Sequence, residues 1–394
     1  MKKENNMDRF LTKCVHKGTH RSNERAINTP IYQSSTFLLK EEDYKKLIQG
    51  RGREINIYSR YGNPTRRSVE EKIASLENTE DALSFSSGMG AIASTLITFL
   101  KPGDEILTTL DIYGGTWTFV AVFLSKFGIK AEYVDPVKTD KIIKKMNGKK
   151  ILFFESLSNP LLKLIDIEEI SKNKKRGQLL VIDNTFLTPF NFNPVGYGAD
   201  LVIHSASKYL NGHSDLIGGL VCGKKSLIDK IWSTMILLGS SMEPIPAYLL
   251  ERGMKSLGVR MERHNKNAEK VALFLGNHKE VKKVIHPNLA SYTQKALKKK
   301  YLKVGSGGMI TFVVSGGDRR GLKFMHNLKV VKEASSLGGV ESLISMPFNT
   351  SHYRVKKEKR IAMGILPGTL RFSVGIEDPE DIIEDINQAL MKTS

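Results

Sequence analysis

The middle of the chain alternates short apolar runs with amphipathic stretches. From about residue 65 to 225, apolar runs of strand length are separated by stretches with helical spacing. Strands that are apolar on both faces are typical of a parallel sheet covered by helices on both sides. The predicted strands are 81–87, 104–110, 130–135, 149–156, 178–185 and 199–207, and the predicted helices are 88–100, 115–128, 138–148 and 166–177.

The pattern changes after about residue 245. A long amphipathic stretch, residues 245–276, predicts one helix, and a smaller α+β region with strands at 308–316 and 369–377 follows it. The predicted fold class is therefore α/β, with a mainly parallel central sheet between helices and a smaller C-terminal α+β domain. The predicted parts are an N-terminal segment 1–62, an α/β domain 63–250 and a C-terminal domain 251–394.

The composition is that of a folded globular protein. The 394 residues are too many for one ordinary hydrophobic core, and 40% are hydrophobic and 26% charged. No apolar run reaches the roughly 20 residues of a membrane helix, and no apolar segment follows the basic start, so we expect neither a membrane anchor nor a secretory signal. The two cysteines, Cys14 and Cys222, fit a reducing cytoplasm. Two are too few for a disulfide framework or a cysteine-built zinc site, and no metal is expected.

The net charge of +19 raises nucleic acid as a partner. The lysines cluster at 172–176, 295–303 and 356–360, within or beside helix-like polar stretches. No series of stacking aromatic residues interleaves with them, as a nucleic-acid-binding face would favour. A solvated lysine-rich surface is the better interpretation, and a basic nucleic-acid-binding protein is kept as the alternative from another functional class.

Polar residues collect where the predicted parallel strands end. Strand 81–87 ends in Ser-Ser-Gly-Met and opens a helix, whose free N–H groups and positive dipole end suit a phosphate. Later strands end in ESLSNP (155–160), VIDNTF (181–186) and HSASK (204–208). Ligands bind at the carboxyl ends of strands in open α/β sheets. A phosphate seat, an amide, a carboxylate and a lysine are therefore predicted to converge.

Pyridoxal phosphate is the cofactor whose chemistry needs this set. The amine of Lys208, at the end of an apolar strand, can form a Schiff base with the cofactor aldehyde. Burial beside positive charge favours the neutral amine, which is the nucleophilic form. A carboxylate such as Asp183 on the pyridine nitrogen keeps the ring protonated and makes it an electron sink.

The remaining groups of this predicted site suit the phosphate and the ring face. Ser205 and Ser207 flank the lysine closely enough to bind the phosphate, beside the amides of Gly88 and Met89. Tyr113, which follows strand 104–110, can stack on the ring.

A second interpretation of the lysine segment exists. Ser205-Ala206-Ser207-Lys208 also matches S-x-x-K, the nucleophile motif of penicillin-binding proteins and class A β-lactamases. That chemistry needs S-D-N and K-T-G partners, and neither string occurs in this chain. The serine acyl-enzyme hypothesis is therefore the weaker one.

The motif order resembles one family over essentially the whole chain. From PIYQSSTF (30–37) to LRFSVGIEDPEDIIEDINQAL (370–390), the sequence is similar to the Cys/Met metabolism family of pyridoxal-phosphate enzymes, the cystathionine γ-synthase, cystathionine γ-lyase and methionine γ-lyase group. The resemblance implies the fold of fold-type I pyridoxal-phosphate enzymes and an amino-acid substrate. It also implies a homotetramer built from dimers that share active sites.

The resemblance assigns roles to residues at both ends of the chain. In the YSR.GNPT segment (58–65), it implies that Tyr58 and Arg60 bind the phosphate of the neighbouring subunit's cofactor, and Arg suits phosphate geometry. Arg371 falls where the family binds the substrate α-carboxylate, assisted by Ser336. Asn159, in ESLSNP, falls where the family contacts the cofactor's phenolic oxygen and the substrate. The family's other cofactor positions are Asp183, Thr185, Ser205, Ser207 and Lys208.

The implied reaction is γ-elimination or γ-replacement on a sulfur amino acid. Lys208 would remove the α-proton, and Tyr113 would protonate the leaving γ-substituent as general acid. Methionine γ-lyases resemble one another in a cysteine two residues after this tyrosine, where the chain has Gly115. Cystathionine enzymes usually carry Glu where it has Ser335, and the substrate-lining segment 345–355 also departs from the family pattern. Because Gly115 weighs against methionine as the main substrate, cystathionine γ-lyase or γ-synthase is the main hypothesis, with the lyase slightly ahead. Methionine γ-lyase or cystathionine β-lyase is the alternative.

Overall fold

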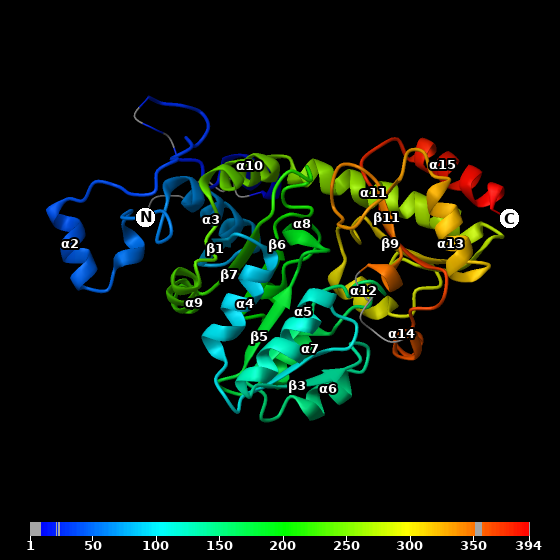
Figure 1. Cartoon of the computed structure of the whole chain (residues 1–394), viewed down its shortest axis with the longest axis horizontal. Helices are drawn as coiled ribbons and strands as arrows, with labels where there is room; N and C mark the ends of the chain where they lie inside the picture. The colour runs from blue at the N-terminus through cyan, green and yellow to red at the C-terminus, as the bar shows by residue number, and fades with distance from the viewer. Residues whose placement is uncertain (1–8, 21, 23, 351–356, 394) are drawn as a thin grey trace. The chain divides into compact units, whose positions relative to one another are not determined.

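The structure is a computed structural model that describes residues 9–20, 22, 24–350 and 357–393 (Figure 1). The chain divides into two compact units that alternate along the sequence. The first unit consists of Met1–Phe99 and Asp200–Gly258, and the second of Leu100–Ala199 and Val259–Ser394. The predicted division at residues 62 and 250 stays a prediction.

The first unit is built on three strands in the order β1-β7-β6. β7 (Gly219–Gly223) runs antiparallel both to β1 (Asp81–Phe85) and to β6 (Leu201–Ser205). The hydrophobic pattern predicted β1 and β6 but missed β7, a short run with glycine at both ends. A Cβ at Gly219 would lie 2.2 Å from the carbonyl oxygen of Ser87, so only glycine fits there.

Helices cover these strands. α4 (Gly88–Phe99) and α9 (Lys225–Leu238) pack on each other and on the strands, as Figure 1 shows. α3 (Pro64–Glu77) packs on α10 (Pro244–Lys255), and the buried Lys72 Nζ lies 3.5 Å from Glu251 between them. The shorter helices of this unit are α1 (Phe10–His16), α2 (Glu41–Ile48) and the single turn η1 (Gly52–Glu54).

Four parallel strands in the order β5-β4-β2-β3 form the sheet of the second unit. The pattern predicted all four strands and the helices at 138–148 and 166–177, and these predictions are confirmed. The strands are β2 (Glu105–Thr109), β3 (Lys130–Val134), β4 (Ile151–Glu155) and β5 (Leu179–Asp183), and the helices are α6 (Thr139–Lys145), α7 (Ile167–Asn173), α8 (Thr188–Asn191) and the 3₁₀ turn η4 (Pro194–Tyr197).

The predicted helix 115–128 is wrong in detail, because three short pieces replace it. α5 (Gly114–Thr118) passes into a π-helical turn, η2 (Phe119–Phe123), and then into a 3₁₀ turn, η3 (Leu124–Phe127). The segment is rich in aromatic and β-branched residues, which lose side-chain freedom in a regular α-helix. The rings of Phe119 and Phe123 stack with centroids 5.1 Å apart.

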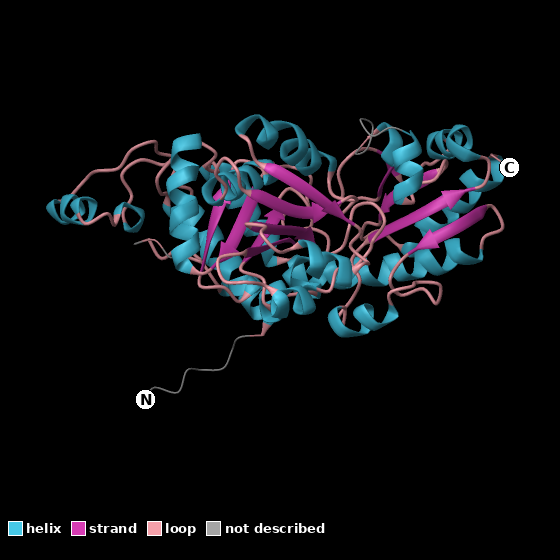
Figure 2. Cartoon of the chain, turned by 90° about the horizontal axis from the view of Figure 1, so that it is seen from below, coloured by secondary structure: helices cyan, strands magenta, loops and turns pink. Residues whose placement is uncertain are grey.

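A second sheet, in the order β10-β11-β12-β9-β8, completes the second unit. Figure 2 shows its strands beside helices close to the C-terminus. The strands are β8 (Val281–Ile285), β9 (Met309–Val314), β10 (Lys332–Glu333), β11 (Leu343–Ser345) and β12 (Thr369–Ser373). The helices are α11 (Leu257–Asn277), α12 (Lys295–Tyr301), α13 (Gly317–His326), α14 (Lys357–Met363), α15 (Pro379–Lys392) and the turn η5 (Pro347–Asn349).

The prediction of one long helix over residues 245–276 is also wrong, because the helix is interrupted at Ser256. α10 ends at Lys255 and α11 begins at Leu257. The Ser256 hydroxyl donates to the carbonyl oxygen of Gly253 at 3.2 Å. A serine that bonds a nearby carbonyl in this way competes with the regular helical pattern, and the hydrophobic periodicity alone does not reveal such a break.

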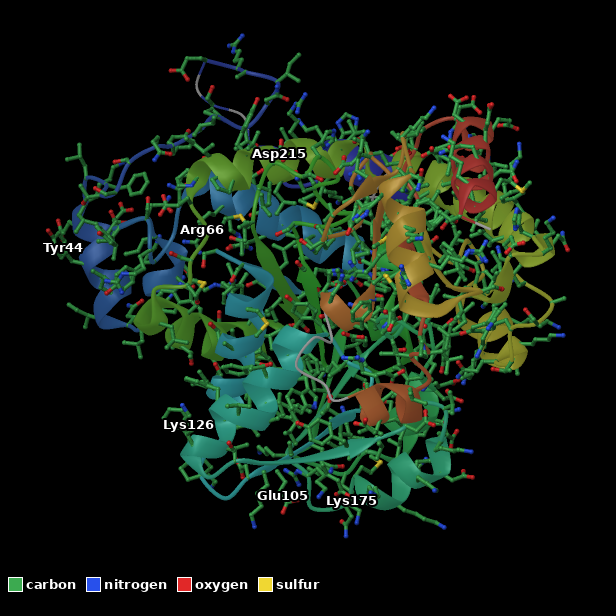
Figure 3. All side chains as sticks on the ribbon, turned by 45° about the vertical axis from the view of Figure 1, so that its right-hand side comes forward. Tyr44, Arg66, Glu105, Lys126, Lys175 and Asp215 are labelled. Atoms are coloured by element: carbon green, nitrogen blue, oxygen red, sulfur yellow. The ribbon has the colours of Figure 1, made fainter. Side chains whose placement is uncertain are left out.

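Part of the lysine-rich surface is engaged in ion pairs. Lys172 lies 3.1 Å and Lys300 2.7 Å from carboxylate oxygens of Glu168, so the clusters at 172–176 and 295–303 meet at one carboxylate. Figure 3 shows Lys126 and Lys175 at the outer margin of the molecule. These contacts support the interpretation of the clusters as a solvated surface. Within the described residues, no helix has the length and apolar character needed to span a bilayer.

The hydrophobic core beneath the second sheet yields a stability prediction. Phe312 in β9 is fully buried and packs edge-to-face on Phe324, with ring centroids 6.1 Å apart. Phe312→Ala should destabilise the protein by about 3–5 kcal/mol, because it removes apolar burial and leaves a cavity. Urea unfolding followed by circular dichroism measures this. Val304→Ala, at a residue 61% exposed, should shift the midpoint little, and an equal effect of both changes would contradict the packing account.

Candidate active site

Strand register brings two predicted phosphate-binding segments of the first unit to the same level. Phe85 at the end of β1 and Ser205 at the end of β6 both pair with Gly219 of β7. α4 begins at Gly88, directly after the β1 end, and a Cβ there would lie 3.0 Å from the Cβ of Ser205. Met89, half-buried, is the next residue of the helix. The helix start and the serine are therefore in contact, as the sequence predicted.

The Lys208 segment is a tight turn held by its own backbone. The amide of Lys208 donates to the carbonyl oxygen of Ser205 at 3.3 Å, and the carbonyl oxygen of Lys208 accepts from the amide of Gly212 at 2.8 Å. The hydroxyl of Ser207 accepts from the amide of Gly218 at 2.9 Å. Lys208 itself is half-buried. These bonds fix the backbone on both sides of the lysine, so that its side chain starts from a defined position.

Tyr58 and Arg60 lie together on an exposed part of the first unit. Tyr58 is 44% exposed. The guanidinium carbon of Arg60 lies 5.7 Å from the centroid of the Tyr58 ring and 5.0 Å from that of Tyr61, within the range of cation–π contacts. Its Nη1 also donates to the carbonyl oxygen of Ile236 at 2.5 Å. The two predicted phosphate ligands are thus neighbours, with Tyr58 exposed and Arg60 half-buried.

In the second unit, two carboxylates end neighbouring parallel strands. Asp183 ends β5 and Glu155 ends β4, and the two residues are partners in the strand register. The Oδ1 of Asp183 accepts from both the amide (3.0 Å) and the hydroxyl (2.6 Å) of Thr185. The two predicted cofactor residues of this strand end are therefore bonded to each other, and the threonine fixes the orientation of the carboxylate.

Glu155 is a buried carboxylate at these strand ends that the sequence analysis did not identify as a site residue. Its side chain is buried, and its Oε1 and Oε2 accept from the amides of Tyr113 (2.8 Å) and Asn159 (2.9 Å). Burial, followed by the negative charge of Asp183, raises the pKa of Glu155 well above its usual value. The one signal in the sequence is that this acidic residue directly follows the apolar run Ile-Leu-Phe-Phe, because a charged residue is unusual at the end of a buried strand.

Tyr113 and Asn159 lie on two loops that are joined a second time. Tyr113, 43% exposed, precedes α5 just after the end of β2. Two residues before it, the buried Asp111 accepts from the hydroxyl of Ser158 at 2.9 Å and lies 3.2 Å from Lys163 Nζ. Burial raises the pKa of Asp111, and Lys163 opposes this effect. The loop after β2 therefore contacts the loop after β4 through two carboxylates.

Arg371 reaches the same loop from the second sheet. This buried residue of β12 donates from Nη2 to the carbonyl oxygen of Ser336 at 2.8 Å and from Nη1 to Oδ1 of Asn159 at 3.5 Å. The structure thus brings together three predicted substrate-binding residues, two of them 212 positions apart in the sequence. Ser336 has φ of 85°, an unusual conformation for a residue with a side chain.

The two subtype positions that depart from the family pattern lie in the same unit. Ser335, beside Ser336, is exposed, and Gly115 is half-buried in the first turn of α5. Residues 351–355 of the substrate-lining segment lie outside the described residues. Within the part of the chain that the structure describes, no three histidine, cysteine or acidic side chains are grouped as metal ligands.

These features fit pyridoxal phosphate. A Cβ at Gly88 would lie only 3.0 Å from the Cβ of Ser205, so the glycine lets the first turn of the 12-residue helix α4 present its N–H groups close to Ser205, an arrangement suited to a phosphate. Asp183, oriented by Thr185, presents a carboxylate suited to a protonated ring nitrogen. A strand-end lysine and a buried arginine complete the set. The fold and these residues define the class of pyridoxal-phosphate-dependent enzymes.

Comparison with known proteins identifies the family within that class. Residues 11–391 match the family described as Cys/Met metabolism PLP-dependent enzyme, and the chain belongs to it. It is 41% identical over 389 residues to the L-methionine γ-lyase of Treponema denticola, covering 97% of each chain. It is also 41% identical over 383 residues to the cystathionine γ-lyase of Bacillus subtilis, covering 96% of this chain and 98% of that protein.

A solved structure supports the same assignment. Cystathionine γ-lyase from Lactobacillus plantarum, complexed with L-serine, matches with a TM-score of 0.90 and 35% sequence identity, over 97% of this chain and 98% of that one. The predicted family, fold class and cofactor are confirmed, and the chain is a pyridoxal-phosphate-dependent enzyme of the carbon–sulfur lyase type. The serine acyl-enzyme hypothesis is excluded by this membership.

The close approach at Gly88 gives a testable prediction about the cofactor. Gly88→Ala should weaken pyridoxal phosphate binding at least about tenfold, because the added Cβ displaces Ser205 or the helix start and disturbs the phosphate donors. Absorbance titration of the apoenzyme measures the dissociation constant. Gly276→Ala is the matched control, since the nearest neighbour of a Cβ there lies 4.0 Å away. Unchanged cofactor affinity in Gly88→Ala would argue against this phosphate seat.

Proposed function

We propose that the enzyme cleaves L-cystathionine by γ-elimination, giving L-cysteine, 2-oxobutyrate and ammonia with the uptake of one water. The observation that carries the proposal is the contact between the buried Arg371 and Asn159, beside Ser336. It gathers a carboxylate-binding guanidinium and a polar amide at one place, as a site for an amino-acid substrate requires. The similarity to a cystathionine γ-lyase over nearly the whole chain supports the choice of substrate.

L-Methionine is the second candidate substrate. The similarity to an L-methionine γ-lyase is as high, at 41% identity. Gly115 stands where methionine γ-lyases carry a cysteine, and this difference favours cystathionine. A cystathionine γ-synthase or β-lyase reaction would use the same residues and differ in what the substrate pocket accepts.

The residues of the second unit would orient both the substrate and the cofactor. Arg371 binds the substrate α-carboxylate through its planar fork. Asp183 holds the ring nitrogen in its protonated form, and Asn159 donates to the ring's phenolic oxygen and to the substrate. Pyridoxal phosphate, when bound, supplies an electron sink that stabilises negative charge next to the α-carbon.

Two side chains would move the protons. The amine of Lys208, which would also hold the cofactor before the substrate binds, would take the proton from the α-carbon. Loss of a second proton, from the β-carbon, would then supply the electron pair of the new Cβ–Cγ double bond as the γ-sulfur leaves. The hydroxyl of Tyr113 donates a proton to the departing γ-sulfur. Ser205, Ser207, Gly88 and Met89 would hold the phosphate during these steps.

Tyr58 and Arg60 would complete the phosphate site of a neighbouring subunit. The assembly would be a homotetramer built from two dimers, and the enzyme would act in the cytoplasm. The exposed position of Tyr58 and the contact that the half-buried Arg60 makes with its ring support this role. Large apolar side chains of the same N-terminal segment are also exposed, among them Ile27 (86%), Leu38 (99%) and Ile48 (88%). Apolar residues exposed to this extent in one segment are typical of an interaction surface.

The products formed from L-cystathionine test the proposed reaction. Mass spectrometry should detect cysteine and 2-oxobutyrate, and Lys208→Ala should lose essentially all turnover while the protein stays folded. Homocysteine and pyruvate would instead establish a β-lyase. Faster turnover of L-methionine would establish the second candidate. If neither substrate is cleaved, an acyl-homoserine with cysteine tests the synthase reaction.

Mixing two inactive variants tests the shared site. If Arg60 serves the neighbouring subunit, a dimer of one Arg60→Ala and one Lys208→Ala chain contains one intact site. Unfolding and refolding an equal mixture should then restore about a quarter of the wild-type sites. Each variant refolded alone is the control. A mixture no more active than the average of the two controls would place Arg60 in the site of its own chain.

A further inference from the structure

Glu155 has a position and a set of partners that no step of the proposed reaction uses. It ends β4, its side chain is 8% exposed, and its two carboxylate oxygens accept from backbone amides of two different loops. A buried carboxylate is costly to maintain unless hydrogen bonds compensate for the lost water. The bonds that Glu155 accepts are those of Tyr113 and Asn159, the two loop residues to which the mechanism assigns contact with the reacting atoms.

We propose that Glu155 is a positioning residue that holds the Tyr113 loop and the Asn159 loop in register with each other. The inference rests on the roles proposed above for Tyr113 and Asn159. Since an amide bonded to a fixed oxygen cannot move far, each loop is anchored at the residue whose side chain must be placed. Glu155 acts through these two residues and not on the substrate directly.

One carboxylate anchors both loops. Oε1 accepts from Tyr113 at 2.8 Å and Oε2 from Asn159 at 2.9 Å, so both bonds depend on the same rigid planar group. A shift of one loop would therefore be transmitted to the other. The loop after β4 is itself compact. The amide of Ser158 donates to the carbonyl oxygen of Lys163, its hydroxyl accepts from the amide of Lys163, and its carbonyl oxygen accepts from the amide of Leu162.

Two further carboxylates act on the charge of Glu155. Asp183 and Asp111 face it from β5 and from the loop after β2, and both raise its pKa in addition to the effect of burial. The amides of Tyr113 and Asn159 act in the opposite direction. Glu155 therefore shares its electrostatic environment with the carboxylate that is proposed to bind the cofactor ring.

Glu155→Gln is the direct test, because glutamine keeps the volume but replaces one acceptor oxygen with an NH₂ group. One of the two loop amides then faces a donor, which leaves a buried N–H unpaired. We expect kcat to fall and KM to rise, with kcat/KM reduced about tenfold to hundredfold, and pyridoxal phosphate affinity to weaken about tenfold. Glu155→Asp, which retains the charge but is shorter, should retain one bond and lie between wild type and Glu155→Gln.

Asp385→Asn is the matched control. Asp385 is also a buried carboxylate of the second unit, and it accepts from the amides of Lys329, Val330 and Val331, none of which belongs to the proposed site. The Asp385→Asn substitution should lower the melting temperature without changing kcat, KM or cofactor affinity. If Glu155→Gln behaves in the same way, with reduced stability alone, its role is only structural and the proposal is overturned.

Hydrogen exchange measured by mass spectrometry provides a readout that needs neither substrate nor turnover. In Glu155→Gln, peptides that contain Tyr113 and Asn159 should exchange faster than in the wild-type holoenzyme, and both should change together. Equal exchange in the two proteins would contradict the proposal. If Glu155→Gln does not fold, Glu155→Asp allows the same comparison.

The outcomes separate this inference from the proposed function. Wild-type enzyme that cleaves none of the amino acids tested would refute the proposed reaction, while the exchange and cofactor measurements would still decide the role of Glu155. Normal wild-type turnover combined with unaltered loop exchange in Glu155→Gln would refute the positioning role alone.

Discussion

The parallel pairing of β4 with β5 places two carboxylates, Glu155 and Asp183, side by side at the ends of buried strands. The arrangement of the second unit depends on the hydrogen-bond donors that compensate these two charges. Like charges in a poorly hydrated environment repel strongly. Each carboxylate is accordingly given its own donors: a threonine amide and hydroxyl for Asp183, and two loop amides for Glu155. Those donors belong to the loops that carry the proposed chemistry, so the need to solvate the charges also determines where the loops lie.

The first unit places the groups proposed to bind the phosphate by close approaches at two glycines. A Cβ at Gly219 would lie 2.2 Å from the carbonyl oxygen of Ser87, and a Cβ at Gly88 would lie 3.0 Å from the Cβ of Ser205. The antiparallel strand β7 links the ends of β1 and β6 at one register level, and so brings the start of α4 to the serine next to the lysine turn. In the first unit, small residues at the strand ends position the segments of the proposed site. In the second unit, hydrogen-bond donors to the carboxylates have that role.

The sequence predicted the elements whose periodicity is strong and missed those determined by tertiary contacts. The apolar strands β1 to β6 were found because burial on both faces leaves a continuous hydrophobic run. β7 was missed because only three apolar residues lie between its two glycines, and the helix break at Ser256 was missed because it depends on one local side-chain bond. The same distinction applies to the site. Lys208 and Asp183 follow apolar strands and could be predicted locally. The role of Arg371 was inferred only from family resemblance, and its contact with Asn159, which joins distant segments, was not predicted.

The difference between cofactor chemistry and substrate choice has a physical origin. Removing an α-proton requires a base, an electron sink and a carboxylate anchor, and these are polar groups fixed by strand ends and hydrogen bonds. Discriminating cystathionine, whose far end carries a second amino-acid group, from methionine, which ends in an S-methyl group, depends on the shape and polarity of the space around the far end of the side chain. A pocket that hydrogen-bonds those polar groups rejects an analogue that lacks them, because its buried partners are then left unpaired. Gly115 and the exposed Ser335 are small residues that specify little by themselves. The polar groups at the strand ends can therefore suit one reaction class while the walls of the pocket determine the substrate.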